Sequence, residues 1–242
     1  MYDLKDLLQK SIEENASDVH FTVGKPPCYR IDGVLTAIEG ERLMPDTLKE
    51  LLLPIMEERH KEELKRDGQT DFAYAIAGVG RFRVNVFRQR GTLASVMRCL
   101  PFEIPKPQSL GIPKEVVEVT NRKRGLVLVT GPTGSGKSTT LASLLHVINQ
   151  SYPYHIITLE DPIEYLHRHD KSIVNQREIG SDSGSYGAAL REDPDVILVG
   201  EMRDLETIST AITAAETGHL VFSTLHTIGA DKTIDRIIDV FP

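Results

Sequence analysis

GPTGSGKST, residues 131–139, matches the pattern G-x-x-x-x-G-K-[ST], and its setting decides the fold of the second half of the chain. The apolar run LVLVT (126–130) precedes it and reads as a strand, while STTLASLLHVINQ (138–150) follows it with a helical pattern. A strand, a glycine-rich turn and a helix in this order are typical of a phosphate-binding loop. The motif therefore predicts that the chain binds a nucleoside triphosphate.

Each residue type in this loop has a chemical reason. Glycines let the backbone turn so that its N–H groups face phosphate oxygens, and the N-terminus of the following helix adds a partial positive charge. Lys137 can reach the β- and γ-phosphates, and the hydroxyl of Ser138 can bind Mg²⁺. We therefore predict ATP and Mg²⁺ as ligands. The predicted nucleotide-binding residues of the loop are Gly131, Pro132, Thr133, Gly134, Ser135, Gly136, Lys137, Ser138 and Thr139.

Short apolar runs organise the whole region from residue 114 to residue 242. LVLVT, HIITL (155–159), DVILV (195–199) and LVFSTL (220–225) are continuous rather than alternating, and helix-like segments separate them. Strands that are buried on both faces have this composition. The pattern predicts an α/β fold with a parallel sheet covered by helices.

The first half of the chain has a different pattern. Prolines 101, 105, 107 and 113 predict a linker over residues 100–113, because proline at this density excludes a regular helix or a central strand. Residues 1–99 before it predict a small α+β domain. Its expected elements are a helix from Leu4 to Ile12, strands in DVHFTV (18–23) and YRIDGVLTAI (29–38) with a hairpin turn at Asp32-Gly33, a helix after Pro45 that Pro54 splits, and a closing hairpin in FAYAIAGVGRFRVNVFRQR (72–90).

Hydrolysis also needs a carboxylate near the phosphates, at the carboxyl end of a neighbouring strand. Glu201 follows the apolar run of DVILVGE, and we predict that it orients the attacking water or holds Mg²⁺ through water. Asp195 opens the same strand, about 20 Å away at the rise of a strand, so it cannot share this role. Glu160, at the end of HIITLE, is a second candidate, and the alternative for both is a solvated acidic turn.

His219 and His226 frame the run LVFSTL. Seven residues of strand span about 23 Å, and an odd offset turns the two side chains to opposite faces. The pair therefore cannot bind one metal ion. Two readings stay open: a pair of polar residues at the ends of a buried strand, or two separate contacts, with His226 at the carboxyl end near the γ-phosphate.

Composition limits the class of protein. The net charge is −7, whereas a protein that grips nucleic acid usually carries a basic excess, so no nucleic-acid partner is expected. There is no apolar stretch of the roughly 20 residues that a membrane-spanning helix needs, and MYDLKDLLQK lacks the features of a secretory signal. Cys28 and Cys99 are too few and too far apart for a disulfide framework. We expect a cytoplasmic protein.

Four segments, taken in order, carry a resemblance to a known family. GPTGSGKST, ITLEDPIEY (157–165), LREDPDVILVGEMRD (190–204) and TGHLVFSTLHT (217–227) resemble the Walker A, Asp, Walker B and His boxes of the secretion ATPase superfamily, which drives type II secretion and type IV pili. Within it, ASDVHFTVGKPPCYRIDG (16–33) and KTIDRIIDVFP (232–242) resemble the pilus retraction ATPases most closely. The resemblance extends over the whole chain, and that family continues beyond DVFP with a C-terminal part that the chain lacks.

The resemblance implies an N-terminal PAS-like domain, a RecA-like P-loop ATPase core, and a ring of six identical subunits with ATP at the interfaces. It implies that Glu201 is the general base, that Glu160 is the Asp-box carboxylate, and that His226 and His219 belong to the site, His219 as a nucleotide contact. It also implies a pilus platform protein of the inner membrane as partner, and a place at the cytoplasmic face of that membrane, reached through partners alone. The arginines expected to act across the interface are Arg81, Arg83 and Arg88.

Three functions follow from these observations. The first is an ATP-driven motor that retracts a pilus, which is the reading we prefer. The second is a RecA-like motor on nucleic acid, which would need a basic channel. The third is a nucleotide-dependent assembly module without motor output.

Overall fold

The computed structural model describes residues 2–100, 103–179 and 186–241, and the statements below refer to these residues. The chain divides into two compact units, Met1–Phe102 and Glu103–Pro242, each with its own sheet. Of the predicted linker, residues 101 and 102 lie outside the described residues, and the part from Glu103 onward belongs to the second unit. In that part, the carbonyl of Pro105 accepts a hydrogen bond of 2.7 Å from the buried hydroxyl of Ser143. No helix among the described residues is long and apolar enough to cross a lipid bilayer.

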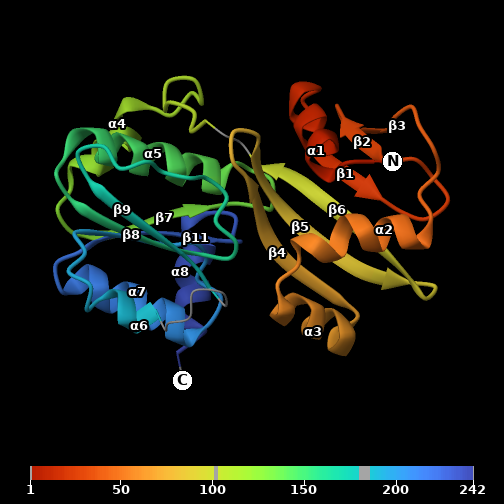
Figure 1. Ribbon diagram of the computed structural model, residues 1–242. Coiled ribbons are helices and arrows are strands. Elements are labelled where there is room, and N and C mark those ends of the chain that lie inside the picture. The colour runs from red at the N-terminus through yellow and green to blue at the C-terminus, as the bar shows by residue number, and fades with distance from the viewer. Residues whose placement is uncertain (1, 101–102, 180–185, 242) are drawn as a thin grey trace. The chain divides into compact units, whose positions relative to one another are not determined.

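The first unit is built on an antiparallel sheet of six strands in the order β3-β2-β1-β6-β5-β4 (Figure 1). Three helices pack their buried residues into one core with one face of this sheet. The elements are α1 (Leu4–Glu13), β1 (Asp18–Phe21), β2 (Cys28–Ile31), β3 (Val34–Ala37), α2 (Pro45–Leu52), a 3₁₀ turn (Leu53–Ile55), α3 (Glu58–Asp67), β4 (Gln69–Ile76), β5 (Gly80–Gln89) and β6 (Thr92–Leu100).

Local chemistry accounts for most of these boundaries. The side chain of Asp3 caps α1, and α2 begins at Pro45 and ends before Pro54, as predicted. Asp32 and Gly33 both have positive φ, 48° and 81°, which a two-residue hairpin turn between β2 and β3 requires. Strand β6 was missed in the prediction, which closed the domain with the hairpin of β4 and β5. That the unit resembles a PAS domain stays a prediction.

The second unit contains a parallel sheet of five strands in the order β7-β11-β10-β8-β9. The predicted α/β fold with a parallel sheet is confirmed. Sequence reasoning missed the edge strand β9, whose residues are mostly polar. The elements are α4 (Lys114–Val117), a 3₁₀ turn (Glu118–Asn121), β7 (Gly125–Thr130), α5 (Lys137–Ser151), β8 (His155–Glu160), β9 (Ile173–Glu178), α6 (Tyr186–Ala189), β10 (Val196–Val199), α7 (Leu205–Glu216), β11 (Leu220–Leu225) and α8 (Ala230–Ile238).

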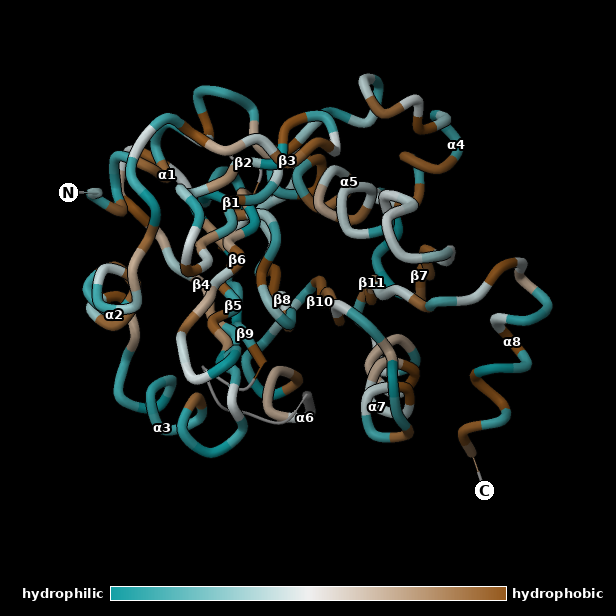
Figure 2. Tube along the Cα trace, turned by 90° about the vertical axis from the view of Figure 1, so that its right-hand side faces the viewer, coloured by the Kyte–Doolittle hydropathy of each residue, from teal (hydrophilic) through white to brown (hydrophobic). Residues whose placement is uncertain are grey.

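Helices cover both faces of this sheet, as Figure 2 shows for α5 and α7 on opposite sides of β10 and β11. The residues of β10 alternate between two cores: Val196 and Leu198 pack with α5, whereas Ile197 and Val199 pack with α7. Burial on both faces explains why the predicted strands are continuous apolar runs. The carboxyl ends of all five strands meet at one edge, where the phosphate loop also lies.

Candidate active site

The phosphate loop runs from the end of β7 to the start of α5. Gly134 and Gly136 have φ values of 78° and 87°, a left-handed conformation in which a side chain is strained. Gly136 is the N-cap of α5, so the helix begins at Lys137 and leaves its first N–H groups available to a ligand. The predicted order of strand, loop and helix is confirmed.

Lys137 is 8% exposed, and its ammonium group lies against the loop itself. Nζ donates to the carbonyl oxygens of Gly131 (3.0 Å) and Pro132 (2.9 Å). These acceptors are neutral, whereas a phosphate is charged, and hydrogen bonds between charged partners are about twice as strong. The contacts therefore hold the lysine inside the loop, where a bound phosphate could replace the two carbonyl groups as the acceptor.

Glu201 follows β10, which is not the direct neighbour of the phosphate-loop strand. Strand β11 lies between β7 and β10, so the expectation that Glu201 emerges from a neighbouring strand is wrong by one strand. Two strand spacings amount to roughly 10 Å. The residue that follows β11 is therefore expected between the loop and the carboxylate.

His226 follows β11 and occupies this intermediate position. Its Nδ1 is 3.4 Å from Oγ1 of Thr133 in the phosphate loop, and its Nε2 is 3.4 Å from Oε1 of Glu201. His226 thus lies at the carboxyl end of its strand and beside the phosphate loop, and its contact with the γ-phosphate stays a prediction. One ring thus connects the loop to the predicted general base.

The backbone around Glu201 is fixed from two sides. The hydroxyl of Thr224, in β11, donates to the carbonyl of Gly200 (2.7 Å), and the backbone carbonyl of Thr224 accepts from the N–H of Met202 (3.1 Å). On the other side, the N–H of Gly200 donates to the carbonyl oxygen of Leu159 at 2.8 Å. A Cβ at Gly200 would lie 3.2 Å from this oxygen. Glycine therefore permits the close approach of the end of β10 to the end of β8, where a Cβ at Gly200 would lie 3.3 Å from Cα of Glu160.

Arg203 also contacts Glu201, and sequence reasoning missed it. Its Nε donates to Oε2 of Glu201 at 2.8 Å, and its Nη1 lies 3.8 Å from Oδ2 of Asp161. The arginine thereby connects Glu201, the second residue after β10, with Asp161, the first residue after β8. The sequence signal was its position two residues after Glu201, which is close enough to fold back onto it.

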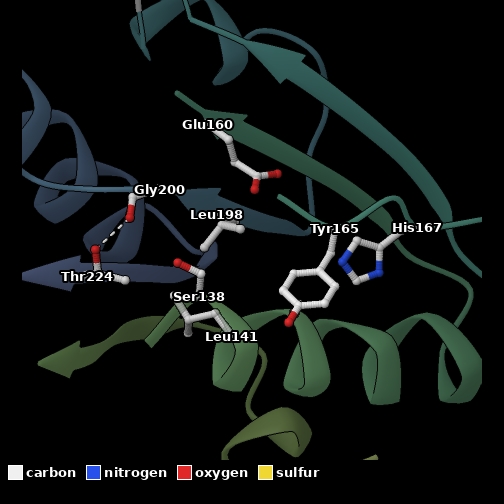
Figure 3. A pocket seen from close by; sticks show the side chains of 9 residues that line it. Ser138, Leu141, Glu160, Tyr165, His167, Leu198, Gly200 and Thr224 are labelled. Atoms are coloured by element: carbon white, nitrogen blue, oxygen red, sulfur yellow. Dashed lines mark hydrogen bonds between the residues drawn. The ribbon is translucent and has the colours of Figure 1, made fainter. Parts of the chain in front are cut away.

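Glu160, at the end of β8, borders a pocket that Ser138 of the phosphate loop also lines (Figure 3). Burial raises the pKa of this carboxyl, and hydrogen bonds from Thr158 (2.7 Å) and Gln176 (3.3 Å) act in the opposite direction. Tyr165 and His167, from the segment after β8, line the same pocket and were not predicted.

The residues present fit a magnesium ion. Among the described residues there is no cluster of three or more His, Cys, Asp or Glu side chains that could bind a metal ion. Mg²⁺ does not need one, because it is commonly held by one or two protein oxygens, several waters and the phosphates of the substrate. The hydroxyl of Ser138 and the carboxylate of Glu160 border one pocket and are oxygen ligands of this kind.

His219 lies at the opposite end of β11, where its Nδ1 is 2.9 Å from the carbonyl of Ala214 and 3.4 Å from Oγ1 of Thr217. The length of β11 separates it from the phosphate loop, which is about 20 Å at the rise of a strand. His219 is therefore far from the phosphate loop of its own chain, and its contact with nucleotide stays a prediction. Its contacts hold the end of α7 against the start of β11.

The three arginines expected to act across an interface lie on β5, in the first unit. Phe82, Val84 and Val86 are fully buried, so Arg81 and Arg83 lie on the other face of the sheet, as the alternation predicts. Nε of Arg83 is 3.9 Å from Oδ1 of Asp71, and Arg88 is exposed at the end of the strand. Their role toward nucleotide stays a prediction.

The phosphate loop, two carboxylates and a histidine thus lie at the carboxyl ends of the strands of one parallel sheet. This arrangement, on a parallel sheet covered by helices, defines a P-loop ATPase of the RecA-like type. Within that class, the chain belongs to the Type II/IV secretion system protein family, whose model matches residues 1–240.

Relatives of this family resemble the chain along its length. It is 48% identical, over 99% of its residues and 71% of the relative, to the type IV pilus retraction ATPase PilT of Pseudomonas aeruginosa. It is 44% identical to a twitching motility protein of Neisseria gonorrhoeae, with 100% of the chain and 66% of the relative covered. The chain thus spans about seven tenths of the length of these relatives.

Solved structures agree with the fold. The crystal structure of the pilus retraction motor PilT with bound ADP matches with a TM-score of 0.96 and 55% identity, over 100% of this chain and 72% of that one. The ATPase DotB of Legionella pneumophila matches with a TM-score of 0.85 and 32% identity, over 98% of this chain and 68% of that one. The P-loop ATPase fold expected from the sequence is therefore confirmed.

Proposed function

We propose that the chain is the ATP-hydrolysing part of a motor that retracts type IV pili. The observation that carries the proposal is the similarity to PilT, 48% identity over 99% of the chain, together with a complete phosphate loop, Glu201 and His226 at one edge of the sheet. The acidic net charge of −7 supports this function over a motor on nucleic acid.

In this proposal, the side chains of the site have different tasks. The phosphate loop and Lys137 bind the β- and γ-phosphates of ATP. Glu201 accepts the proton of the attacking water. His226 fixes the position of Glu201 relative to the phosphate loop. Arg203, through its bond of 2.8 Å to Oε2, leaves Oε1 of the same carboxylate facing His226.

Magnesium belongs to the proposal as well. Ser138 would bind it directly, and Glu160 or Glu201 would bind it through water. When bound, Mg²⁺ neutralises charge that develops on the β- and γ-phosphates.

The proposal includes a ring of six identical subunits, in which Arg81, Arg83 and Arg88 of one subunit face the phosphate loop of the next. A guanidinium group suits the oxygens of a γ-phosphate, and an arginine supplied across an interface accelerates other nucleotide hydrolases about 10³–10⁵-fold. The ring would act at the cytoplasmic face of the inner membrane, on a platform protein of the pilus machine. The N-terminal domain (1–99, PAS-like) would carry the arginines, and residues 114–242 the ATPase core.

Twitching motility tests this function in cells. The full open reading frame that contains the chain is expressed in a piliated strain that lacks its own retraction ATPase, either unchanged or with Lys137→Ala. We expect the unchanged protein to restore twitching zones and the variant to leave the cells piliated and non-motile. Loss of surface pili in cells that express the Lys137→Ala variant, or equal restoration of twitching by the two proteins, would contradict the proposal.

A further inference from the structure

Gln176, on the edge strand β9, uses both ends of its side-chain amide. Nε2 donates to the carbonyl of Tyr165 (2.7 Å) and to Oε1 of Glu160 (3.3 Å), and Oε1 accepts from the N–H of His167 (2.7 Å). A glutamine amide offers two N–H donors and one carbonyl acceptor, so both donors and the acceptor are engaged. These bonds join β9 to Glu160 and to the segment that follows it.

The register of the sheet explains this reach. Thr158 of β8 pairs with Gln176 of β9, so the two side chains lie on the same face of the sheet, and Glu160 lies two residues further along that face. Thr158 also donates to Oε1 of Glu160, at 2.7 Å. The carboxylate is therefore held by donors from two neighbouring strands.

The second bond of Gln176 leads back to the phosphate loop. Tyr165, whose carbonyl Gln176 holds, is 8% exposed, and its hydroxyl lies 3.0 Å from Oγ1 of Thr139. Thr139 is the last residue of the loop motif, two residues after Lys137. Figure 3 shows Tyr165 and Glu160 at the border of the same pocket as Ser138.

We propose that Gln176 and Tyr165 form a clamp that sets the positions of Glu160 and Thr139 together. The clamp would align the Glu160 carboxylate with the phosphate loop for hydrolysis. The clamp rests on the proposed ATPase function and assigns positioning roles to two residues that do not react. Gln176 acts on Glu160 directly, and on Thr139 through Tyr165.

The two members of the clamp are expected to differ in kinetics. Loss of the Gln176 amide removes a donor to Glu160 and the bond to the carbonyl of Tyr165, so it should lower kcat more than it changes KM. Loss of the Tyr165 hydroxyl frees Thr139 and should raise KM more than it lowers kcat.

The test uses Gln176→Met, which keeps the length of the side chain but removes its donors, and Tyr165→Phe, which removes one hydroxyl. Asn175→Ala is the matched control, because it removes a different side-chain bond of β9, that to His155 (2.9 Å). We expect Gln176→Met to lower kcat roughly 10- to 100-fold with little change in KM. Tyr165→Phe should raise KM about threefold or more, while Asn175→Ala keeps the kcat and KM of the unchanged protein.

A second readout does not depend on hydrolysis. ADP binding should slow amide hydrogen exchange across residues 161–167 in the unchanged protein, and much less in Gln176→Met and Tyr165→Phe. Equal protection in all of them, or equal kcat for Gln176→Met and Asn175→Ala, would overturn the clamp. An unchanged protein that binds ADP with this protection but does not hydrolyse ATP would contradict the proposed function and leave the clamp supported.

Discussion

Nε2 of His226 lies 3.4 Å from Oε1 of Glu201, while Nδ1 of the same ring lies 3.4 Å from the hydroxyl of Thr133. The relationship follows from the strand order, because β11 separates the phosphate-loop strand from β10. The residue at the end of β11 is consequently the one that bridges the loop and the base. His219, at the other end of the same strand, has no such position.

The two histidines should therefore differ in their effect on turnover. His226→Ala removes the bridge, and we expect kcat to fall roughly 10- to 100-fold with little change in the free energy of unfolding. His219→Ala should keep kcat within about threefold and lower the free energy of unfolding by about 1 kcal/mol, the value of a lost hydrogen bond. Steady-state kinetics and chemical denaturation of both variants provide the measurement. Equal losses of activity would point to a structural role for both.

Lys137→Ala should weaken binding of the triphosphate itself. The substitution removes a cation that lies inside the loop, in contact with the carbonyls of Gly131 and Pro132. We expect the affinity for a non-hydrolysable ATP analogue to fall about tenfold or more, the loss of a charge-assisted hydrogen bond. Titration calorimetry measures it, with Lys114→Ala at an exposed position as the control. Unchanged affinity would remove the lysine from phosphate binding.

Stability should fall in mild acid because of His167. Burial, and then the neighbouring His146, lower the pKa of His167 from 6.5 to about 4. Between these values the unfolded chain binds a proton that the folded chain does not. The free energy of unfolding therefore decreases as the pH falls from about 6.5 to about 4, by up to roughly 1.4 kcal/mol per pH unit for this group.

Urea denaturation of the unchanged protein and of His167→Gln, at pH 5 and pH 7, tests this sign. The variant should lose less stability between the two values than the unchanged protein. His169→Gln, at an exposed position, should behave like the unchanged protein. A pH dependence that His167→Gln leaves intact would show that other groups cause it.

The place of the phosphate loop between β7 and α5 could be predicted because its pattern is local: glycine, lysine and serine stand at fixed offsets between a strand and a helix. Glu201, Glu160 and His226 could be predicted because each follows an apolar run that ends at the ligand-binding edge. The order of the strands could not be predicted, because the sequence alone does not determine which apolar runs pair with each other. For this reason β10 was expected one strand too close to the loop.

The supporting residues were missed for a related reason. Gln176 lies on an edge strand with mostly polar residues, which has no clear strand pattern, and Tyr165 lies in an irregular segment after β8. Gln176 reaches Glu160 through the pairing of β8 with β9, and Tyr165 reaches the phosphate loop through its hydroxyl on Thr139. Both contacts join residues that are far apart in the sequence. Strand β6 was missed because Leu93, Ala94 and Ser95 are buried in succession, without the alternation that marks a strand with one buried face.

The arginines on β5 are testable by mixing subunits. Arg81→Ala/Arg83→Ala and Glu201→Gln should each be inactive alone. If the site is shared between subunits, mixed rings contain interfaces with intact arginines on one side and an intact base on the other, and activity returns in part. Absence of recovery in rings whose mixing is demonstrated by native mass spectrometry would assign these arginines to the surface of the first unit.

The most direct test of the account is ATP turnover by Glu201→Gln, measured beside its binding of an ATP analogue. The change is nearly isosteric and removes the carboxylate charge that faces His226, while the loop and Lys137 stay intact. We predict that binding stays within about threefold of the unchanged protein and that kcat falls about 10²–10⁴-fold, the usual contribution of a general base. Turnover within about threefold of the unchanged protein would contradict the central claim that Glu201 activates the attacking water.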